Sequence, residues 1–226
     1  MTPKSTGLRR FVAPPPRTAA EPERCALCAT ELAEGHRHLV DTQDRSIACA
    51  CTACWLLFTH QGAAGRRDQA IRPGAISGRY RTVPDRVLHD PAAPLTDMEW
   101  AALAIPVTTA FFFLNSALGR VVASYPSPAG VTECELDLAA WDEVAAAHPL
   151  LRALVPDVEA ILIARPDTFL VPIDVCYALA GTLRLNWHGF DGGDEVRQTM
   201  AALLADLRRR ARTLPPGTDT ATDGRA

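Results

Sequence analysis

The sequence lacks an excess of positive charge. Its 23 Lys and Arg residues are outnumbered by 26 Asp and Glu residues, which gives a net charge of -3 and a pI near 6.1. A protein of this balance has no overall basic field to attract a phosphate backbone. The local exception is the segment from Arg66 to Arg86, where six arginines stand against two aspartates. The composition therefore argues against a nucleic-acid partner and leaves this segment as the place where one would bind.

The sequence also lacks a secretory signal and an uninterrupted membrane-spanning segment. Two early arginines are followed by Pro14 to Pro16, where a signal peptide would have an apolar run. Residues 100–119 carry no charged side chain and have the length of a bilayer span. However, Thr96 to Glu99 has the pattern of a capping box that begins a helix, and Pro106 would end that helix. We therefore expect a cytoplasmic protein with no membrane span, whose uncharged segment forms a helix and then a β-hairpin.

Known catalytic signatures are absent as well. The chain contains no serine nucleophile elbow, no HExxH motif and no common glycine-rich phosphate-binding pattern. The best candidate for an anion-binding loop, residues 187–193, is interpreted as a plain entry turn into the last helix. Asp174, Cys176 and His188 offer a base, a nucleophile and a third partner, but Cys176 lies in an apolar helical run typical of an inert buried thiol. The sequence favours a non-enzymatic protein.

What the sequence does contain is a cluster of cysteines. Five of its seven fall within a short stretch, as Cys25-Ala-Leu-Cys28 followed by Cys49-Ala-Cys51-Thr-Ala-Cys54. Two CxxC pairs about twenty residues apart are typical of a site where four thiolates bind one tetrahedral ion. In the absence of a signal peptide, we expect these thiols to stay reduced rather than to form disulfides. The spacing predicts a metal centre at Cys25, Cys28, Cys51 and Cys54.

Three neighbouring residues are alternative ligands. Cys49 stands two positions before Cys51, so on a strand both would face the same side. We expect Cys49 to be a small buried hydrophobe or a spare thiol close to the site, with a ligand exchange as the alternative. His36 and His38 could also replace a thiolate. Their alternation on the segment between the two pairs favours surface or packing roles instead.

Four thiolates suit zinc and iron alike, because both ions accept tetrahedral sulfur coordination. Iron sites of the rubredoxin type usually have a glycine after each CxxC pair, whereas Ala29 and Trp55 occupy these positions. Zinc is therefore the predicted cofactor and iron the alternative. A module of about forty residues is too small to be stable by burial alone, so the ion would supply most of its folding free energy, on the order of 10 kcal/mol.

The chain divides into five predicted ranges. Its two ends are rich in proline, alanine and charge, a composition that does not bury enough surface to order the chain. In order, we predict a disordered arm, a four-cysteine zinc-ribbon-like module, a linker carrying the arginine-rich patch, an α+β domain and a disordered tail, at residues 1–22, 23–62, 63–94, 95–212 and 213–226. Within the module, two short strands are expected around the turn Thr42-Gln43-Asp44.

Strands and helices alternate irregularly along residues 95–212. After the helix that begins near Thr96, strands are predicted at 107–114, 121–125, 131–136 and 159–165, and helices at 138–147, 149–154 and 172–183. A last amphipathic helix places Val196, Met200, Leu203, Leu204 and Leu207 on one face. This order favours an α+β fold with helices packed on one face of a mainly antiparallel sheet.

Several stretches together resemble an uncharacterised actinobacterial family that is often encoded beside uptake nickel–iron hydrogenase genes. They are the two cysteine segments, the strand His36 to Asp41, and Tyr125-Pro-Ser-Pro-Ala-Gly130, Pro172-Ile-Asp-Val-Cys-Tyr177 and Trp187-His-Gly-Phe-Asp-Gly-Gly193. The resemblance covers most of Arg24 to Arg212. It implies a role in hydrogenase assembly or electron transfer, with a hydrogenase subunit or maturation protein as the partner.

Three functions remain open from the sequence. The first is a non-enzymatic metal-binding accessory protein, in which the cysteine module is a rigid docking element for a partner protein. The second is an electron carrier with an iron–tetrathiolate centre of the rubredoxin type. The third is a nucleic-acid-binding regulator that would use the arginines between Arg66 and Arg86.

Overall fold

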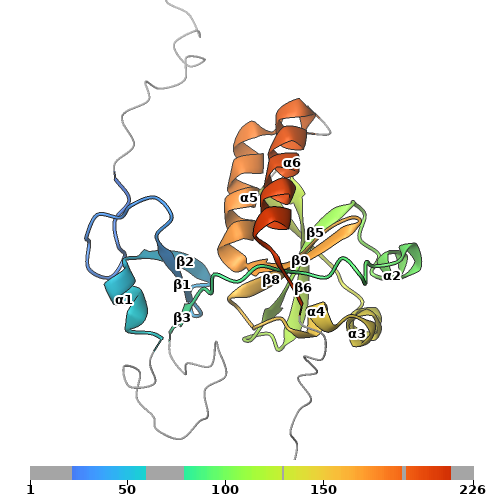
Figure 1. Cartoon of the computed structure of the whole chain (residues 1–226), viewed down its shortest axis with the longest axis horizontal. Helices are drawn as coiled ribbons and strands as arrows, with labels where there is room; N and C mark the ends of the chain where they lie inside the picture. Colours follow the sequence, from blue (N-terminus) through green and yellow to red (C-terminus); the bar gives the residue numbers. More distant parts are fainter. Residues whose placement is uncertain (1–21, 60–78, 129, 190–191, 215–226) are drawn as a thin grey trace, which may run out of the picture.

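The computed structural model describes residues 22–59, 79–128, 130–189 and 192–214. The predicted disordered arm and tail lie almost entirely outside these ranges. The described part contains a three-stranded sheet in the order β2-β1-β3 and a seven-stranded sheet in the order β10-β4-β9-β8-β5-β6-β7 (Figure 1). Paired strands are antiparallel except for β10, which runs parallel to β4. The predicted α+β class with an antiparallel sheet is confirmed.

The small sheet forms around the cysteine segments. β1 (Arg37–Asp41) and β2 (Ser46–Ala50) make the hairpin predicted between the two CxxC pairs. The short helix α1 (Thr52–Leu56) follows directly, and β3 (Tyr80–Thr82) pairs with the other edge of β1. The result is a compact module of one hairpin, one helix and one added strand.

A carboxylate network holds the turn of this hairpin. The side chain of Asp41, a buried residue, accepts hydrogen bonds from the backbone N–H groups of Gln43 and Asp44 at 3.0 and 3.2 Å. Arg79 donates from Nε to Asp41 at 2.6 Å and also contacts Asp44 at 2.5 Å. An Asx-type turn with a paired carboxylate thus supports the hairpin register at its turn.

Residues 63–94, interpreted from the sequence as a linker, contribute a strand to each sheet. β3 joins the small sheet, and β4 (Leu88–His89) pairs with a central strand of the large sheet. Between them, Arg86 donates to the fully buried carboxylate of Glu159 at 2.5 and 2.7 Å. The described part of this range therefore connects the two sheets through backbone pairing and a buried ion pair. Such short polar strands give no periodic pattern, so the sequence did not reveal them.

The large sheet contains the four strands predicted after Pro106, two short strands that were not predicted, β4 and β10, and one longer strand that was also missed. Its strands are β5 (Thr109–Asn115), β6 (Arg120–Ser127), β7 (Gly130–Cys134), β8 (Glu159–Ala164), β9 (Asp167–Pro172) and β10 (Arg212–Thr213), together with β4. The longer missed strand is β9, which pairs with β8 along its whole length. It ends at Pro172, directly before the next helix, with no turn residues between them. The sequence therefore contains no signal that a separate strand ends there.

The helices match the predicted starts closely. They are α2 (Asp97–Ala102), α3 (Leu138–Ala147), α4 (Pro149–Arg152), α5 (Ile173–Asn186) and α6 (Gly193–Arg210). The capping box at Thr96 and Glu99 is present, and Asp137 caps α3 as predicted. Local side-chain chemistry was therefore sufficient to locate these helix starts.

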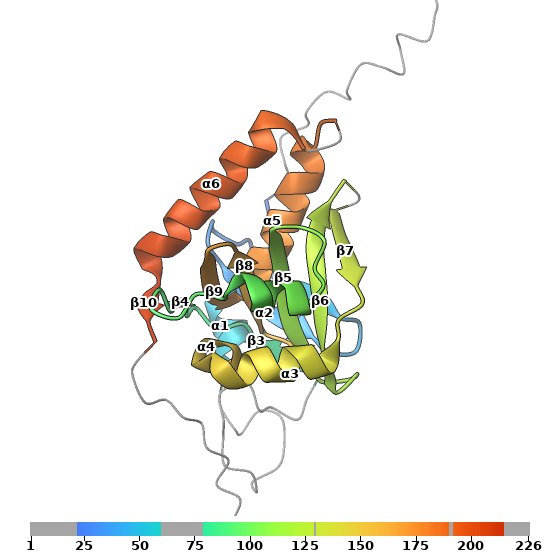
Figure 2. The same ribbon diagram turned by 90° about the vertical axis from the view of Figure 1, so that its right-hand side faces the viewer.

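Helices cover both faces of the large sheet, so the prediction of one covered face was wrong. Residues such as Phe112 and Ile161 pack with α2, α3 and α4, whereas their neighbours Phe111 and Leu162 pack with α5 and α6 on the other side (Figure 2). Successive strand residues point to opposite faces, so two covered faces bury every position. All six residues of β8 are accordingly buried. The continuous apolar run of this strand is the sequence signal for that arrangement.

The uncharged segment of residues 100–119, which has the length of a membrane span, is part of this domain. Its first residues end α2, and Ala110, Phe111 and Phe112 then lie in β5 within the core. The predicted helix followed by a hairpin is confirmed. Among the described residues, no helix is both long enough and apolar enough to cross a bilayer.

The module packs against the larger domain through a third apolar cluster. Val40 of the hairpin and Val83 contact Val158 and Ile173, all of them buried. Arg81 and Asp157 form an ion pair at 2.7 Å beside this cluster. The hairpin therefore presents one face to α5 and to the segment that leads into β8.

Candidate metal centre

The first cysteine pair lies in a tight turn ahead of the hairpin. Within it, the backbone N–H of Cys25 donates to the Thr30 carbonyl and that of Ala29 donates to the Cys25 carbonyl, each at 2.8 Å. Ala29 has a φ of 60°, in the left-handed region that glycine usually occupies. The turn thus adopts the expected knuckle conformation even though alanine follows the pair.

The second pair lies at the start of a helix rather than in a second tight turn. Cys51 is the N-cap of α1, and its Sγ accepts a hydrogen bond from the Cys54 backbone N–H at 3.4 Å. The N–H of Trp55 donates to the Cys51 carbonyl at 2.9 Å, which continues the helix. In this detail the module differs from the two turns predicted from the sequence, because the CxxC spacing also fits one turn of helix.

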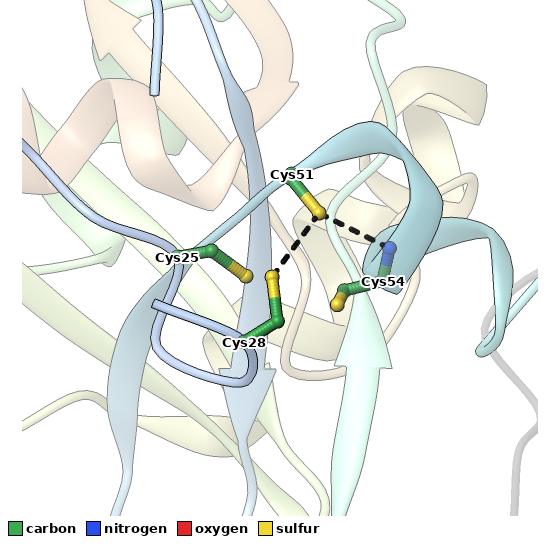
Figure 3. A group of neighbouring side chains, drawn as sticks. All are labelled: Cys25, Cys28, Cys51 and Cys54. Atoms are coloured by element: carbon green, nitrogen blue, oxygen red, sulfur yellow. Dashed lines mark hydrogen bonds between the residues drawn. The ribbon is translucent and has the colours of Figure 1, made fainter. Parts of the chain in front are cut away.

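The four predicted cysteines converge. The Sγ atoms of Cys25, Cys28, Cys51 and Cys54 all lie within 4.8 Å of one another (Figure 3). The Sγ atoms of Cys28 and Cys51 are 3.7 Å apart, and all four thiols are free rather than disulfide-bonded. With a metal–sulfur bond of about 2.3 Å, a tetrahedral site requires a sulfur–sulfur distance of about 3.8 Å. The donor set fits a tetrahedral ion.

A backbone hydrogen bond connects the two halves of the site. The N–H of Ala26 donates to the Cys49 carbonyl at 2.9 Å, which joins the first turn to the end of β2. Because α1 begins immediately after β2, this bond places both cysteine pairs at the same end of the hairpin. The hairpin is therefore the element that brings cysteines distant in sequence together.

The pKa values of the thiols in the cluster are shifted in different directions. Burial opposes ionisation of Cys25, but backbone hydrogen bonds from Cys51, Leu27 and Cys28 outweigh it and lower the pKa to about 6. Hydrogen bonds with Cys51 and Cys28 raise the pKa of Cys54 to about 12. Hydrogen bonding to Thr30 lowers the pKa of Cys28. The ion-free cluster therefore holds both thiolate and thiol, and a cation must displace protons to bind all four sulfurs.

Cys49 lies outside this quartet, in a group that the sequence did not predict. Its Sγ and one ring nitrogen from each of His36 and His38 lie within 4.8 Å of one another. All three residues are half-buried rather than exposed. The available signal was the alternation of the two histidines combined with the hairpin register, which places His38 opposite Cys49.

The remaining candidates for catalysis do not assemble. Asp174 contacts His38, whereas His188 is exposed and its closest carboxylate partner is Glu195 at 3.7 Å. Cys176 is buried in the core, and desolvation raises the pKa of its thiol. Among the described residues, these three side chains form no triad. The prediction that Cys176 lies buried in an apolar helical run is confirmed.

The loop at residues 187–193 is described except for residues 190 and 191. In its described part, the Trp187 indole N–H donates to the Gly189 carbonyl at 3.1 Å. Gly192, with a φ of 87°, is the N-cap of α6 and lies against Val196, which leaves no room for a larger side chain. These contacts are those of a helix-entry turn.

The arginine-rich patch is partly accounted for by ion pairs. Arg66, Arg67 and Arg72 lie outside the described residues. The other three form ion pairs: Arg79 with Asp41 of the hairpin, Arg81 with Asp157, and Arg86 with Glu159. Half of the patch thus stabilises the fold instead of presenting free charge to a phosphate backbone.

The family to which this chain belongs follows from comparison with known proteins. Searches of curated proteins and of solved structures find no match to the chain. Residues 24–211 match a family described as "Family of unknown function (DUF5947)". This range includes the four-cysteine cluster, both sheets except β10, and all six helices. The chain is a member of this family of unknown function.

Proposed function

We propose that the protein is a non-enzymatic, zinc-binding accessory protein that docks on a partner through its four-cysteine module, and that this partner is a nickel–iron hydrogenase subunit or maturation protein. The observation that carries the metal-binding part is the convergence of Cys25, Cys28, Cys51 and Cys54 from two distant segments. The hydrogenase part rests on the family resemblance described above.

Zinc is favoured over iron by the backbone around the second pair. Redox iron sites are tuned by N–H groups that hydrogen-bond to the sulfurs. Here the Trp55 N–H is used by the helix, because it donates to the Cys51 carbonyl. A structural zinc ion needs only a closed tetrahedral thiolate set. The position after the second pair thus gives no N–H hydrogen bond to a sulfur, which favours zinc, although the Cys54 N–H donates to Cys51 Sγ and backbone N–H groups also contact Cys25.

A docking role is supported by exposed apolar side chains in the cysteine segments. Leu27, between the first two cysteines, is 39% exposed, and Leu56 and Leu57 at the end of α1 are 47% and 56% exposed. Exposed apolar residues near a rigid metal-bound scaffold are typical of a protein-binding surface. A nucleic-acid surface would instead present free arginines, and the described arginines of the patch are paired.

The metal is tested by elemental analysis and absorption spectroscopy of the full chain purified without oxygen. We expect a colourless protein that contains zinc and no stoichiometric iron. A red protein with visible charge-transfer bands would instead support the rubredoxin-like electron carrier. A protein without bound metal would contradict both functions.

The partner is tested by co-purification from a host that expresses the hydrogenase genes. Leu56→Glu combined with Leu57→Glu is expected to abolish capture, because a charge at the centre of an apolar interface is desolvated without a partner. Leu185→Glu, at a position 83% exposed at the end of α5, is the matched control and should leave capture unchanged. Absence of every hydrogenase subunit and maturation protein from the captured material would overturn the proposed partner.

A further inference from the structure

A second group of metal-ligating side chains lies on the hairpin, beside the four-cysteine cluster and separate from it in its atoms. His38 of β1 stands directly opposite Cys49 of β2, and His36 is two residues before His38. His36 immediately precedes β1, and residues two apart along an extended chain share a face. The Cys49 Sγ and one ring nitrogen from each histidine accordingly lie within 4.8 Å of one another.

The His36 ring is arranged to accept an ion. Its Nδ1 lies 3.1 Å from the Ala33 carbonyl oxygen, and since a carbonyl only accepts hydrogen bonds, Nδ1 carries the proton. Nε2 is then left with a free lone pair. This atom is buried, has no hydrogen-bond partner among the described residues, and belongs to a side chain only 10% exposed. A buried acceptor without a partner is costly, so the structure indicates that something else binds it.

The His38 ring has the same arrangement with a stronger partner. Its Nδ1 lies 2.8 Å from Oδ2 of Asp174, in the first turn of α5. The carboxylate accepts the Nδ1 proton and leaves Nε2 free to bind an ion. Metal-binding histidines almost always donate their other ring N–H to a carboxylate or a backbone carbonyl, which fixes the tautomer and raises ligand basicity. Both histidines of this group meet that condition, one with each type of acceptor.

We propose that His36, His38 and Cys49 form a second zinc site with three protein ligands and one open coordination position. Two imidazoles and one thiolate suit zinc, and three protein ligands leave a fourth place for water or for a group from a partner. A divalent ion bound to one thiolate carries a net positive charge, which the Asp174 carboxylate balances across His38. The closed four-thiolate site carries two net negative charges when it holds zinc, and a second site neutralised by Asp174 adds no charge repulsion to it.

This second site connects the module to the larger domain. The hairpin supplies all three ligands, whereas the carboxylate that orients His38 comes from α5. An ion at this position would therefore be sensitive to how the hairpin packs on α5. The closed site, in contrast, draws all its ligands and their backbone contacts from the module.

The decisive measurement is the zinc content of the full chain after extensive dialysis. We expect two zinc ions per chain in the unchanged protein and one in Cys49→Ala and in His36→Ala. The ion retained by the variants, together with an unchanged circular dichroism spectrum, shows that the module is still folded. Cys134→Ala, which removes a half-buried cysteine on β7, is the control and should retain two ions.

Two further readouts separate this proposal from a ligand exchange in which Cys49 replaces a member of the quartet. X-ray absorption at the zinc edge should show imidazole scattering in the unchanged protein and none in Cys49→Ala. Asp174→Ala should lower the affinity for one of the two zinc ions about 10- to 100-fold and leave the affinity for the other unchanged, as measured by competition with a chromophoric chelator. One zinc ion per unchanged chain, or two in His36→Ala, would overturn the proposal.

Discussion

The cysteine module and the larger domain are stabilised in different ways. In the described part of the module, the buried apolar residues are Cys25, Leu39, Val40 and Ala50. The larger domain instead buries two extensive clusters, one on each face of its sheet, with large side chains such as Phe112 and Phe169. From so little buried area we expect the module to depend on a bound ion for its folding, whereas the domain is stabilised by packing. The predictions below test this difference.

The largest effect is expected from Cys28→Ser. Loss of one thiolate should release the ion of the closed site, and the module would lose stabilisation on the order of 10 kcal/mol. We expect residues 25–54 to unfold while β5 to β9 keep their structure, which amide hydrogen exchange would resolve residue by residue. Cys134→Ser is the matched control and should leave exchange in the module unchanged. Stoichiometric metal retained in Cys28→Ser would show that a different set of cysteines binds it.

Phe112→Ala should produce the converse result. Phe112 is fully buried in β5 and stacks on Trp141 of α3, with ring centroids 4.9 Å apart. Removing a buried phenylalanine costs about 3–5 kcal/mol through lost transfer free energy and the cavity left behind. Denaturant unfolding should show this loss in the domain, while zinc content stays unchanged. Loss of zinc from this variant would mean that the two regions fold as one unit.

Arg86→Ala tests the ion pair that joins the connecting segment to the domain. The Glu159 carboxylate is fully buried and bound by Arg86, and removing that partner leaves an uncompensated buried charge. We expect a loss of about 3 kcal/mol in the free energy of unfolding. Arg209→Ala removes an exposed pair with Asp206 and should cost less than about 1 kcal/mol. Equal effects in the two variants would show that burial of Glu159 does not matter.

Per pH unit, the smallest change is expected in the pH dependence of metal binding. Near neutral pH the Cys54 thiol, with its pKa raised to about 12, must release its proton when the ion binds, whereas Cys25 is already ionised. Below about pH 6, the pKa of Cys25, that thiol must release a proton as well. Affinity should therefore decrease as the pH falls, and the decrease should steepen below about pH 6 by about tenfold per pH unit. Chelator competition from pH 5 to 8 measures it, and a constant slope would contradict the assignment.

Local signals in the sequence were reliable where a few adjacent residues determine the conformation. The capping box at Thr96, the cap at Asp137 and the turn after Asp41 all form as predicted. Their donors and acceptors are within three residues of one another, so no distant segment is needed. The first CxxC turn is also closed by hydrogen bonds of its own, from Cys25 to Thr30 and from Ala29 to Cys25, in addition to the bond from Ala26 to Cys49.

Long-range pairing was not predictable in the same way. β3 and β4 are short, polar strands that are ordered only because β1 and β9 offer free edges. β9 was missed because α5 begins directly after it, with no turn between Pro172 and Ile173. The second helical layer was missed because its evidence, a strand buried on both faces, was interpreted as an ordinary strand.

The amino-acid sequence by itself determined which cysteines could meet, because the CxxC spacing and the hairpin between the pairs are local properties. Only the tertiary structure determined which other potential ligands lie close together. The hairpin register places His38 beside Cys49, and the packing of the hairpin on α5 brings Asp174, 136 residues away in the chain, into contact with His38. The physical reason is that a strand register and a docked helix depend on the burial of Val40, Val83 and Ile173, which no short segment contains.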